Sequence, residues 1–354
     1  MAIVAPPLHF LFGGQEVQAH NLVTLWSGDR AARVTFVSSR PDTLGRLAII
    51  EKVPYLRTAA RFPSYIASLY EATQTVQILH VFAGSFSSFL IATAPAVLLG
   101  RILKKKVLIH YHNGRAETHL RKSRIARYIV HMCDAVVVPS PFLERIFRAH
   151  HRQVEVVPNV VDPVRFRYTS REPLRPRFVC TRNWEPHYGI EIVVRAFAKI
   201  QREFPEATLC LVGRGSNEPA LRKLVKDLGL NNTSFERPVH PDEMHALYEQ
   251  CDIFLNGSYV DCSPVSILES FCAGLPVVTT SAGGIRDLVE DGETGLLSPP
   301  GDWEGLGANA IRILRQPDFA RDLARRARAK AESNSWHNVR DRWLSIYQHL
   351  LRSE

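Results

Sequence analysis

The chain has 354 residues, 45% of them hydrophobic and 22% charged, which is the composition of a soluble globular protein, and its formal net charge is +9. This length exceeds the size at which one hydrophobic core usually stops growing, which argues against a single domain. The six cysteines form no CxxC pair and several lie in apolar contexts, so a reducing compartment is expected.

Strands and helices alternate through the first half of the chain. The N-terminal sequence MAIVAPPLHFLFGG lacks a basic leader, so we expect a first strand that runs into a glycine loop and no signal peptide. Strand-helix alternation predicts a parallel sheet covered on both faces. The strands are expected near residues 2–5, 33–38, 77–82, 106–112, 134–139 and 153–157.

An apolar segment, Val81 to Leu103, ends in three lysines and superficially resembles a membrane span with a basic stop. Glycine, serine, threonine and proline interrupt it, so the uninterrupted apolar run is well short of the ~20 residues that a span needs. A buried helix between two strands is the better interpretation.

Positive charge is concentrated in the N-terminal half. Residues 1–170 carry 21 Lys and Arg against 10 Asp and Glu, a net of +11, and the remainder carries 23 against 25, a net of −2. No nucleic-acid-binding motif or base-stacking pattern accompanies this charge. A solubilising face and a membrane-facing role both stay open. The densest part contains Arg101, Lys104, Lys105, Lys106, Arg115, Arg121, Lys122, Arg124 and Arg127.

Two prolines in the segment 157–166 break the alternation and mark an interdomain linker. A second series of strands follows, which predicts a second doubly wound domain. Two such domains in tandem would leave a cleft facing the carboxyl ends of both sheets, where these folds bind ligands. The second series is expected near 178–181, 208–213, 233–235, 252–255, 277–280 and 295–297.

The most informative stretch runs from Asp252 to Asp302. An apolar strand is followed by a loop and then by a helix near Pro264, with Ser263 as its expected N-cap. Free backbone donors at the helix N-terminus favour phosphate binding there. Asp261 precedes this helix and Glu269 lies about one and a half turns into it, so one ligand can touch both carboxylates.

This stretch resembles the nucleotide-sugar-binding segment of the family 4 glycosyltransferases, retaining enzymes with the GT-B fold. That family has an E-x7-E motif, and here the first acid is Asp261. The sequences ESFCAGLPVVTTSAGG and DGETGLLSPPGD match the rest of the motif closely. By resemblance, Glu269 would bind the ribose hydroxyls, Asp261 the transferred sugar, and the backbone around Val265 and Ser266 the diphosphate.

The resemblance extends along nearly the full chain. PNVVDPVRF stands at the family's linker motif, and Arg182 matches the arginine that contacts the donor diphosphate. A family lysine is expected five residues later, but this chain has His187 and Tyr188 before Gly189, which removes one positive charge from the phosphates unless one of these residues substitutes. We assign Tyr188 to the donor site with Arg182.

In the first half, Gly13 and Gly14 match the family's glycine loop near the sugar phosphate, and His112 matches its histidine near the transferred sugar. His110 and His112 point to the same side of a strand, but spacing places no third ligand, so a metal pair is disfavoured. There is no D-x-D motif, and the resemblance implies a metal-independent enzyme without a cofactor.

The resemblance implies a GT-B fold made of two Rossmann-like α/β domains. We expect an acceptor domain over residues 1–167 and a nucleotide-sugar domain over 168–335. Apolar residues at helical spacing predict a final helix over 336–354, which the family sends back to the N-terminal domain. The stripe consists of Trp336, Val339, Trp343, Ile346, Tyr347 and Leu350.

The implied reaction is retaining transfer of a hexose-type sugar from a UDP- or GDP-sugar to a hydroxyl of a lipid-linked or saccharide acceptor, in cell-surface polysaccharide or glycolipid synthesis. His112, Asp261 and Arg182 are the expected catalytic residues. A cytoplasmic location, peripheral on the inner face of the plasma membrane, is expected, with no nucleic acid partner. A nucleotide-sugar epimerase or hydrolase and a catalytically impaired nucleotide-sugar-binding protein are the alternatives.

Overall fold

The computed structural model describes residues 1–7, 13–41, 54–151 and 153–352, and divides into two compact units. Unit 1 contains residues 1–158 together with 340–354, and unit 2 contains residues 159–339. Residues 159–167, which we expected in the N-terminal domain, belong to unit 2. In unit 2, Asn159 donates a hydrogen bond to the Ser263 carbonyl and Phe166 lies in the core.

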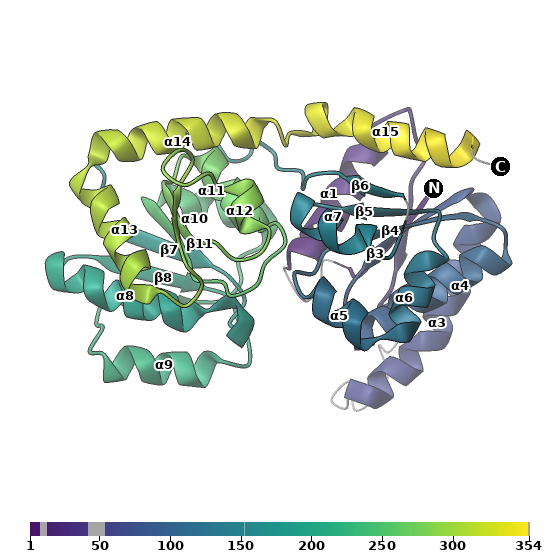
Figure 1. Ribbon diagram of the computed structural model, residues 1–354, viewed down its shortest axis with the longest axis horizontal. Coiled ribbons are helices and arrows are strands. Elements are labelled where there is room, and N and C mark those ends of the chain that lie inside the picture. The colour runs from purple at the N-terminus through teal and green to yellow at the C-terminus, as the bar shows by residue number, and fades with distance from the viewer. Residues whose placement is uncertain (8–12, 42–53, 152, 353–354) are drawn as a thin grey trace. The chain divides into compact units, whose positions relative to one another are not determined.

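Unit 1 is built on a six-stranded parallel sheet with the strand order β2-β1-β3-β4-β5-β6. Its strands are β1 (Ala2–Ala5), β2 (Thr35–Ser38), β3 (Ile78–Ala83), β4 (Lys106–Tyr111), β5 (Ala135–Val138) and β6 (Val154–Val156). Its helices are α1 (Gly14–Ser27), α3 (Pro54–Thr75), a π-helical turn η1 (Phe89–Thr93), α4 (Ala94–Ile102), α5 (Ala116–Lys122), α6 (Arg124–His131) and α7 (Pro141–Arg148). Helices cover both faces of the sheet (Figure 1).

Unit 2 repeats this plan with the strand order β12-β11-β10-β7-β8-β9, again parallel throughout. Its strands are β7 (Arg177–Thr181), β8 (Thr208–Val212), β9 (Thr233–Glu236), β10 (Ile253–Asn256), β11 (Val277–Thr280) and β12 (Leu296–Ser298). Its helices are η2 (Pro186–Tyr188), α8 (Ile190–Glu203), α9 (Glu218–Asp227), η3 (Pro241–Glu243), α10 (Met244–Glu249), α11 (Val265–Ala273), α12 (Ile285–Leu288), α13 (Trp303–Arg315) and α14 (Pro317–Glu332).

The central strands β10 and β11 of unit 2 are fully buried because both faces of the sheet are covered there, whereas the edge strand β9 is half-buried or exposed. Successive side chains of a strand point to opposite faces, and the two cores follow this rule. Phe178 and Ile253 pack in the core that includes α8 and α13, whereas Val179 and Phe254 pack in the core that includes α10, α11 and α14. The predicted α/β class, with two doubly wound parallel sheets, is confirmed.

The expected buried helix between β3 and β4 is buried on one side only. It begins as the π-helical turn η1 and continues as α4. Ala96 and Val97 are fully buried, whereas Leu98 and Ile102 are exposed. No helix among the described residues is long and apolar enough to cross a membrane.

The final helix, α15 (Trp336–Arg352), joins unit 1 from Arg340 onward. Arg340 forms an ion pair with Asp29 at the C-terminal end of α1. The indole of Trp343 packs on the ring of His80 in β3, with ring centroids 4.9 Å apart. The apolar stripe predicted for this helix therefore contributes to the core of unit 1.

We expect Trp343→Ala to lower the free energy of unfolding by about 3–5 kcal/mol, because Trp343 is 1% exposed and its loss leaves a cavity against β3. Urea unfolding followed by circular dichroism measures this change. Leu351→Ala is the matched control in the same helix, since Leu351 is 49% exposed, and it should change the stability by less than about 0.5 kcal/mol. Equal effects of both variants would contradict the packing role of Trp343.

Candidate functional site

The candidate site of unit 2 lies at the point where its strand order reverses. Strands β7 and β10 are neighbours in the sheet, but the chain continues from them in opposite directions, to β8 and β9 and to β11 and β12. Loops after two such strands diverge and leave room for a ligand at their carboxyl ends. Arg182 follows β7 and Asp261 lies in the loop after β10, so the sheet brings together two residues 79 positions apart.

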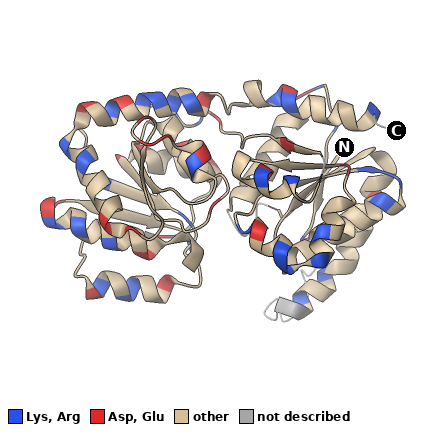
Figure 2. Cartoon of the chain, in the orientation of Figure 1, with Lys and Arg blue, Asp and Glu red and all other residues tan. Residues whose placement is uncertain are grey.

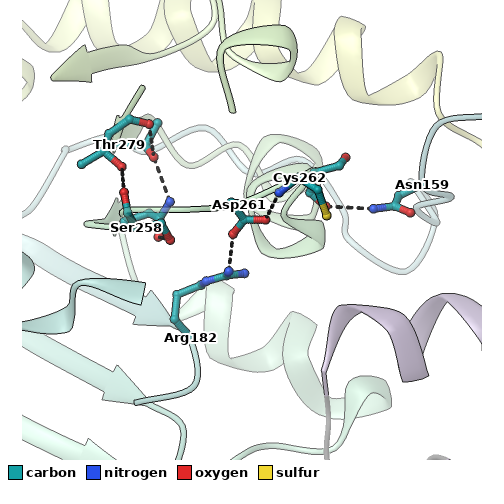
Figure 3. Close-up of polar contacts among 9 residues, drawn as sticks. Asn159, Arg182, Ser258, Asp261, Cys262 and Thr279 are labelled. Carbon is teal, nitrogen blue, oxygen red and sulfur yellow. Dashed lines mark hydrogen bonds and ion pairs between the residues drawn. The ribbon is translucent and has the colours of Figure 1, made fainter. Parts of the chain in front are cut away.

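Three side-chain hydrogen bonds hold the beginning of the loop after β10 (Figure 3). Asn256 Nδ2 donates to Thr279 Oγ1 over 2.9 Å, Ser258 Oγ donates to Asn256 Oδ1 over 2.8 Å, and Thr280 Oγ1 donates to the Ser258 carbonyl over 2.5 Å. A Cβ at Gly257 would lie 2.3 Å from the Gly189 carbonyl oxygen, so only glycine allows this close approach. The loop is therefore fixed to β11 and to the turn before α8.

Arg182 and Asp261 form an ion pair that is almost completely withdrawn from solvent, with side chains 12% and 8% exposed (Figure 3). Asp261 Oδ1 also accepts the Cys262 backbone N–H over 2.8 Å, and the Arg182 guanidinium lies 4.2 Å from the centroid of the Tyr188 ring. Burial opposes the charge of Arg182, but its surroundings, with Asp261 first among them, raise its pKa above the usual arginine value. Three predicted site residues thus form one cluster.

Tyr188 stands next to the position at which the family motif has a lysine. Tyr188 places the face of its ring against the Arg182 guanidinium, and such cation–π contacts stabilise a cation without adding charge. Tyr188 ends the turn η2, and Gly189 follows it with a left-handed φ of 58° that favours glycine. Tyr188 therefore orients the arginine and does not replace the lysine charge.

Helix α11 begins with uncapped backbone donors. The N-cap residue is Pro264, not Ser263 as predicted, because Pro264 has extended backbone angles (φ −69°, ψ 119°) and Val265 is the first helical residue. No side chain caps this end, and the buried Ser266 hydroxyl has no hydrogen-bond partner in the part of the chain that the structure describes. Uncapped donors at the positive end of a helix dipole and an unpaired hydroxyl are features of an anion site.

Glu269 lies about one turn beyond Val265, the first residue of α11, and is 8% exposed. The Tyr248 hydroxyl donates to Glu269 Oε2 over 3.0 Å, and Thr181 Oγ1 lies 3.0 Å from the same hydroxyl oxygen. Burial raises the pKa of Glu269 to about 7, although the Tyr248 hydrogen bond acts in the opposite direction. Sequence analysis missed Tyr248 because it belongs to α10, outside every motif.

In unit 1, Gly13 is the N-cap residue of α1 and Gly14 is its first helical residue. The carboxylate of Glu16 lies against Gly13, where a Cβ would be 2.5 Å from Glu16 Oε2. Burial raises the pKa of Glu16. The beginning of α1 is therefore a glycine turn with an adjacent carboxylate, and residues 8–12 of the predicted glycine loop lie outside the described residues.

His112 follows β4, and its backbone N–H donates to the Ala83 carbonyl at the end of β3 over 3.4 Å. Its Nε2 lies 2.8 Å from His110 Nε2. Burial lowers the pKa of His112 and of His80 to about 3 and that of His110 well below its usual value. No group of three or more metal-ligating side chains suited to a metal ion occurs among the described residues.

Both halves of the chain match models of glycosyltransferase families. Residues 12–165 match Glycosyltransferase Family 4, and residues 169–330 match Glycosyl transferases group 1. The chain belongs to the family 4 glycosyltransferases.

Family members with curated names are distant relatives. Glycogen synthase of Mycobacterium tuberculosis is 25% identical over 65% of this chain, and N-acetyl-alpha-D-glucosaminyl L-malate synthase of Bacillus anthracis is 30% identical over 47%. The chain spans 58% of the length of the first protein and 43% of the second.

Solved GT-B structures share the fold over the whole chain. Sucrose-phosphate synthase of Thermosynechococcus elongatus matches with a TM-score of 0.77 at 19% identity, covering 100% of both chains. Anabaena HepE in complex with UDP-glucose matches with a TM-score of 0.75 at 18% identity, covering 99% of both chains. The predicted GT-B fold is therefore confirmed.

Three histidines of this glycosyltransferase, the buried His80 and His110 and the partly buried His112, predict acid sensitivity of unit 1. His80, His110 and His112 stay uncharged in the folded state but gain protons in the unfolded state below its pKa of 6.5. Their stabilisation is therefore present above pH 6.5 and is lost as the pH falls. At pH 5.5 each histidine should lower the free energy of unfolding by about 1.4 kcal/mol, and all three on the order of 4 kcal/mol.

Hydrogen exchange of β3 and β4 amides between pH 7.5 and 5.5 measures this loss in unit 1 alone. The measurement is restricted to unit 1 because unit 2 responds in the opposite direction: the raised pKa of Glu269 stabilises unit 2 as the pH falls from 7.5 to 5.5. His80→Phe should reduce the pH dependence by about one third, whereas His131→Gln, on the exposed side of α6, should leave it unchanged. Equal pH dependence in wild type and His80→Phe would contradict the assignment.

Proposed function

We propose that this chain is a retaining glycosyltransferase that moves a sugar from a nucleoside diphosphate donor to a hydroxyl acceptor. The observation that carries the proposal is the cluster of Arg182, Tyr188 and Asp261 beside the uncapped N-terminus of α11. A buried arginine and the positive end of a helix dipole can both stabilise the negative charge that develops on a departing diphosphate. The UDP-glucose complex of the related HepE structure supports a UDP-sugar donor, and GDP-sugars remain the alternative.

The proposed division of labour follows the resemblance to the family. Glu269, whose pKa burial raises to about 7, binds the ribose hydroxyls through its carboxylate once this is ionised, and Tyr248 keeps the side chain in place. The diphosphate takes the Arg182 guanidinium, for which Asp261 is the competing partner in the free protein. Asp261 then binds the transferred sugar. For unit 1, taken by itself, we assign His112 to sugar binding and Gly13 and Gly14 to phosphate binding. No protein nucleophile and no metal ion are required in this scheme.

Glu269→Ala and a panel of UDP-, GDP- and ADP-sugars with hydroxyl acceptors test the proposal together. We expect one donor to give a glycoside with retained anomeric configuration. The variant should bind the matching nucleoside diphosphate roughly tenfold to a hundredfold more weakly, because a hydrogen bond to a charged group contributes about 1.5–3 kcal/mol. Glu293→Ala, which removes an exposed carboxylate of the same unit, is the calorimetric control.

Other outcomes of this assay separate the alternatives. Consumption of the donor without acceptor would identify an epimerase or hydrolase. Nucleotide binding without turnover on any acceptor would identify a catalytically impaired binding protein, which the missing lysine motivates. Equal nucleotide affinity of Glu269→Ala and wild type would contradict the assigned ribose site.

We further propose that a basic face on α4 to α6 binds anionic lipid, which brings the enzyme to a membrane-borne acceptor at the inner face of the plasma membrane. Lys and Arg gather on these helices of unit 1 (Figure 2). Exposed apolar side chains lie among them, including Ile125 at 58% and Tyr128 at 64% exposure. Cations beside exposed apolar groups favour an anionic membrane surface over plain solvent.

Not all cations of this face are available to lipid. Arg127 donates to the carbonyl groups of Leu120 and Arg121 at the end of α5, and Arg101 pairs with Asp134. Arg121, Lys122 and Arg124 are exposed and carry the proposal.

Changing Arg121, Lys122 and Arg124 to Gln should abolish co-sedimentation with vesicles that contain anionic lipid at low salt, because each engaged cation contributes about 1 kcal/mol. The matched control changes Arg202, Lys223 and Lys226, three exposed cations of unit 2, and should bind like wild type. If wild type stays in the supernatant at low salt, or if the variant with Arg121, Lys122 and Arg124 changed binds as well as wild type, the charge of this face serves solubility only.

A further inference from the structure

Four side chains of unit 1 form one line of hydrogen bonds that ends at the proposed sugar-binding histidine. Tyr347 Oη of α15 lies 2.8 Å from His80 Nδ1 of β3, and His80 Nε2 lies 3.2 Å from His110 Nδ1 of β4. His110 Nε2 lies 2.8 Å from His112 Nε2. Tyr347, His80 and His110 are 4%, 0% and 3% exposed, so water does not interrupt the line.

The Tyr347 hydroxyl sets the direction of the line. Its single hydrogen needs an acceptor, because a buried hydroxyl without a hydrogen-bond partner destabilises the folded protein. Within residues 1–7, 13–41, 54–151 and 153–352, His80 Nδ1 is its only hydrogen-bond acceptor. Burial also raises the pKa of Tyr347, so the phenol keeps this hydrogen. Tyr347 therefore donates and His80 Nδ1 accepts.

The remaining protons follow from the chemistry of imidazole. An uncharged ring has one N–H and one accepting nitrogen. Since His80 accepts at Nδ1, it carries its proton on Nε2 and donates to His110 Nδ1. His110 then carries its proton on Nε2 and donates to His112 Nε2. His112 must therefore carry its own proton on Nδ1, the nitrogen that has no hydrogen-bond partner among the described residues.

The surroundings of the rings keep them uncharged. His80 stacks on Phe82 with ring centroids 5.1 Å apart, and the indole of Trp343 lies 4.9 Å from His110 as well as from His80. Burial of this kind disfavours an imidazolium and lowers the pKa of each of the three histidines. A charged ring would donate from both nitrogens and break the line.

We propose that Tyr347, His80 and His110 form a relay that fixes His112 as the Nδ1-protonated, uncharged form, so that it donates a hydrogen bond to a hydroxyl of the bound sugar. Tyr347 and His80 are positioning residues, since they act through His112. The inference rests on the proposed function for the identity of the ligand, but the protonation of His112 follows from unit 1 alone. With the line reversed, His112 Nδ1 would accept instead.

The test combines nitrogen NMR of ¹⁵N-histidine-labelled protein with transfer kinetics. Protonated and bare ring nitrogens have well-separated chemical shifts, and His112→Gln assigns the His112 signals by their loss. In wild type we expect a protonated Nδ1 and a bare Nε2. Tyr347→Phe removes the donor at the far end, so both forms of His112 should be populated. Its kcat should fall roughly fivefold to tenfold with unchanged affinity for the nucleoside diphosphate.

Tyr65→Phe is the matched control. Tyr65 is 1% exposed and its hydroxyl donates to the Ala92 carbonyl over 2.6 Å, so this variant also loses one buried hydroxyl of unit 1 but leaves the relay intact. Its His112 signals and kcat should equal those of wild type. His80→Phe interrupts the relay at the next position and replaces Tyr347→Phe if the latter does not fold.

Three results would overturn the proposal. A protonated Nε2 on wild-type His112 would show that the line runs the other way. Identical His112 signals in wild type and Tyr347→Phe would show that Tyr347 does not set them, and an unchanged kcat with altered signals would show that the sugar does not use this proton. A wild type that makes no product with any donor would refute the proposed function, while the nitrogen shifts would still decide the protonation of His112.

Discussion

The ion pair between Arg182 and Asp261 is the interaction around which the candidate site of unit 2 is organised. Two charges removed from water are tolerated only when they are paired and further hydrogen-bonded, and loss of one partner is strongly destabilising. This requirement explains why Tyr188 lies against the guanidinium and why the Cys262 N–H donates to the carboxylate. It also keeps the loops after β7 and β10 together, beside the N-terminus of α11. In the proposed function, a donor phosphate competes for Arg182 with the Asp261 carboxylate.

Much of this arrangement was predictable because the motifs are local. Strand-helix alternation predicted both sheets, and the apolar strand, loop and helix around Asp261 and Glu269 occur as expected. The prediction of Ser263 as the N-cap of α11 was wrong. It relied on the serine side chain, which is favoured at this position, but the N-cap is Pro264, one residue later, and the Ser263 carbonyl accepts a hydrogen bond from Asn159. Capping propensity could not include that distant partner.

The parts that sequence reasoning missed are long-range contacts. Tyr248 reaches Glu269 across 21 residues, and Tyr347 reaches His80 across 267. Neither tyrosine lies in a motif, and each had been interpretable as ordinary apolar packing. The roles of His112, Asp261, Arg182 and the glycine turn stay predictions that rest on family resemblance, since geometry alone shows positions and partners.

The division into units has a consequence for synthesis of the chain. Unit 2 is continuous, from residue 159 to 339, whereas unit 1 is made of two separate stretches. All of unit 2 is therefore synthesised before residues 340–354, the second stretch of unit 1. Until then, β3 exposes to solvent the side of His80 that Trp343 later covers. The N-terminal half must wait for the C-terminal end of the chain to complete its core.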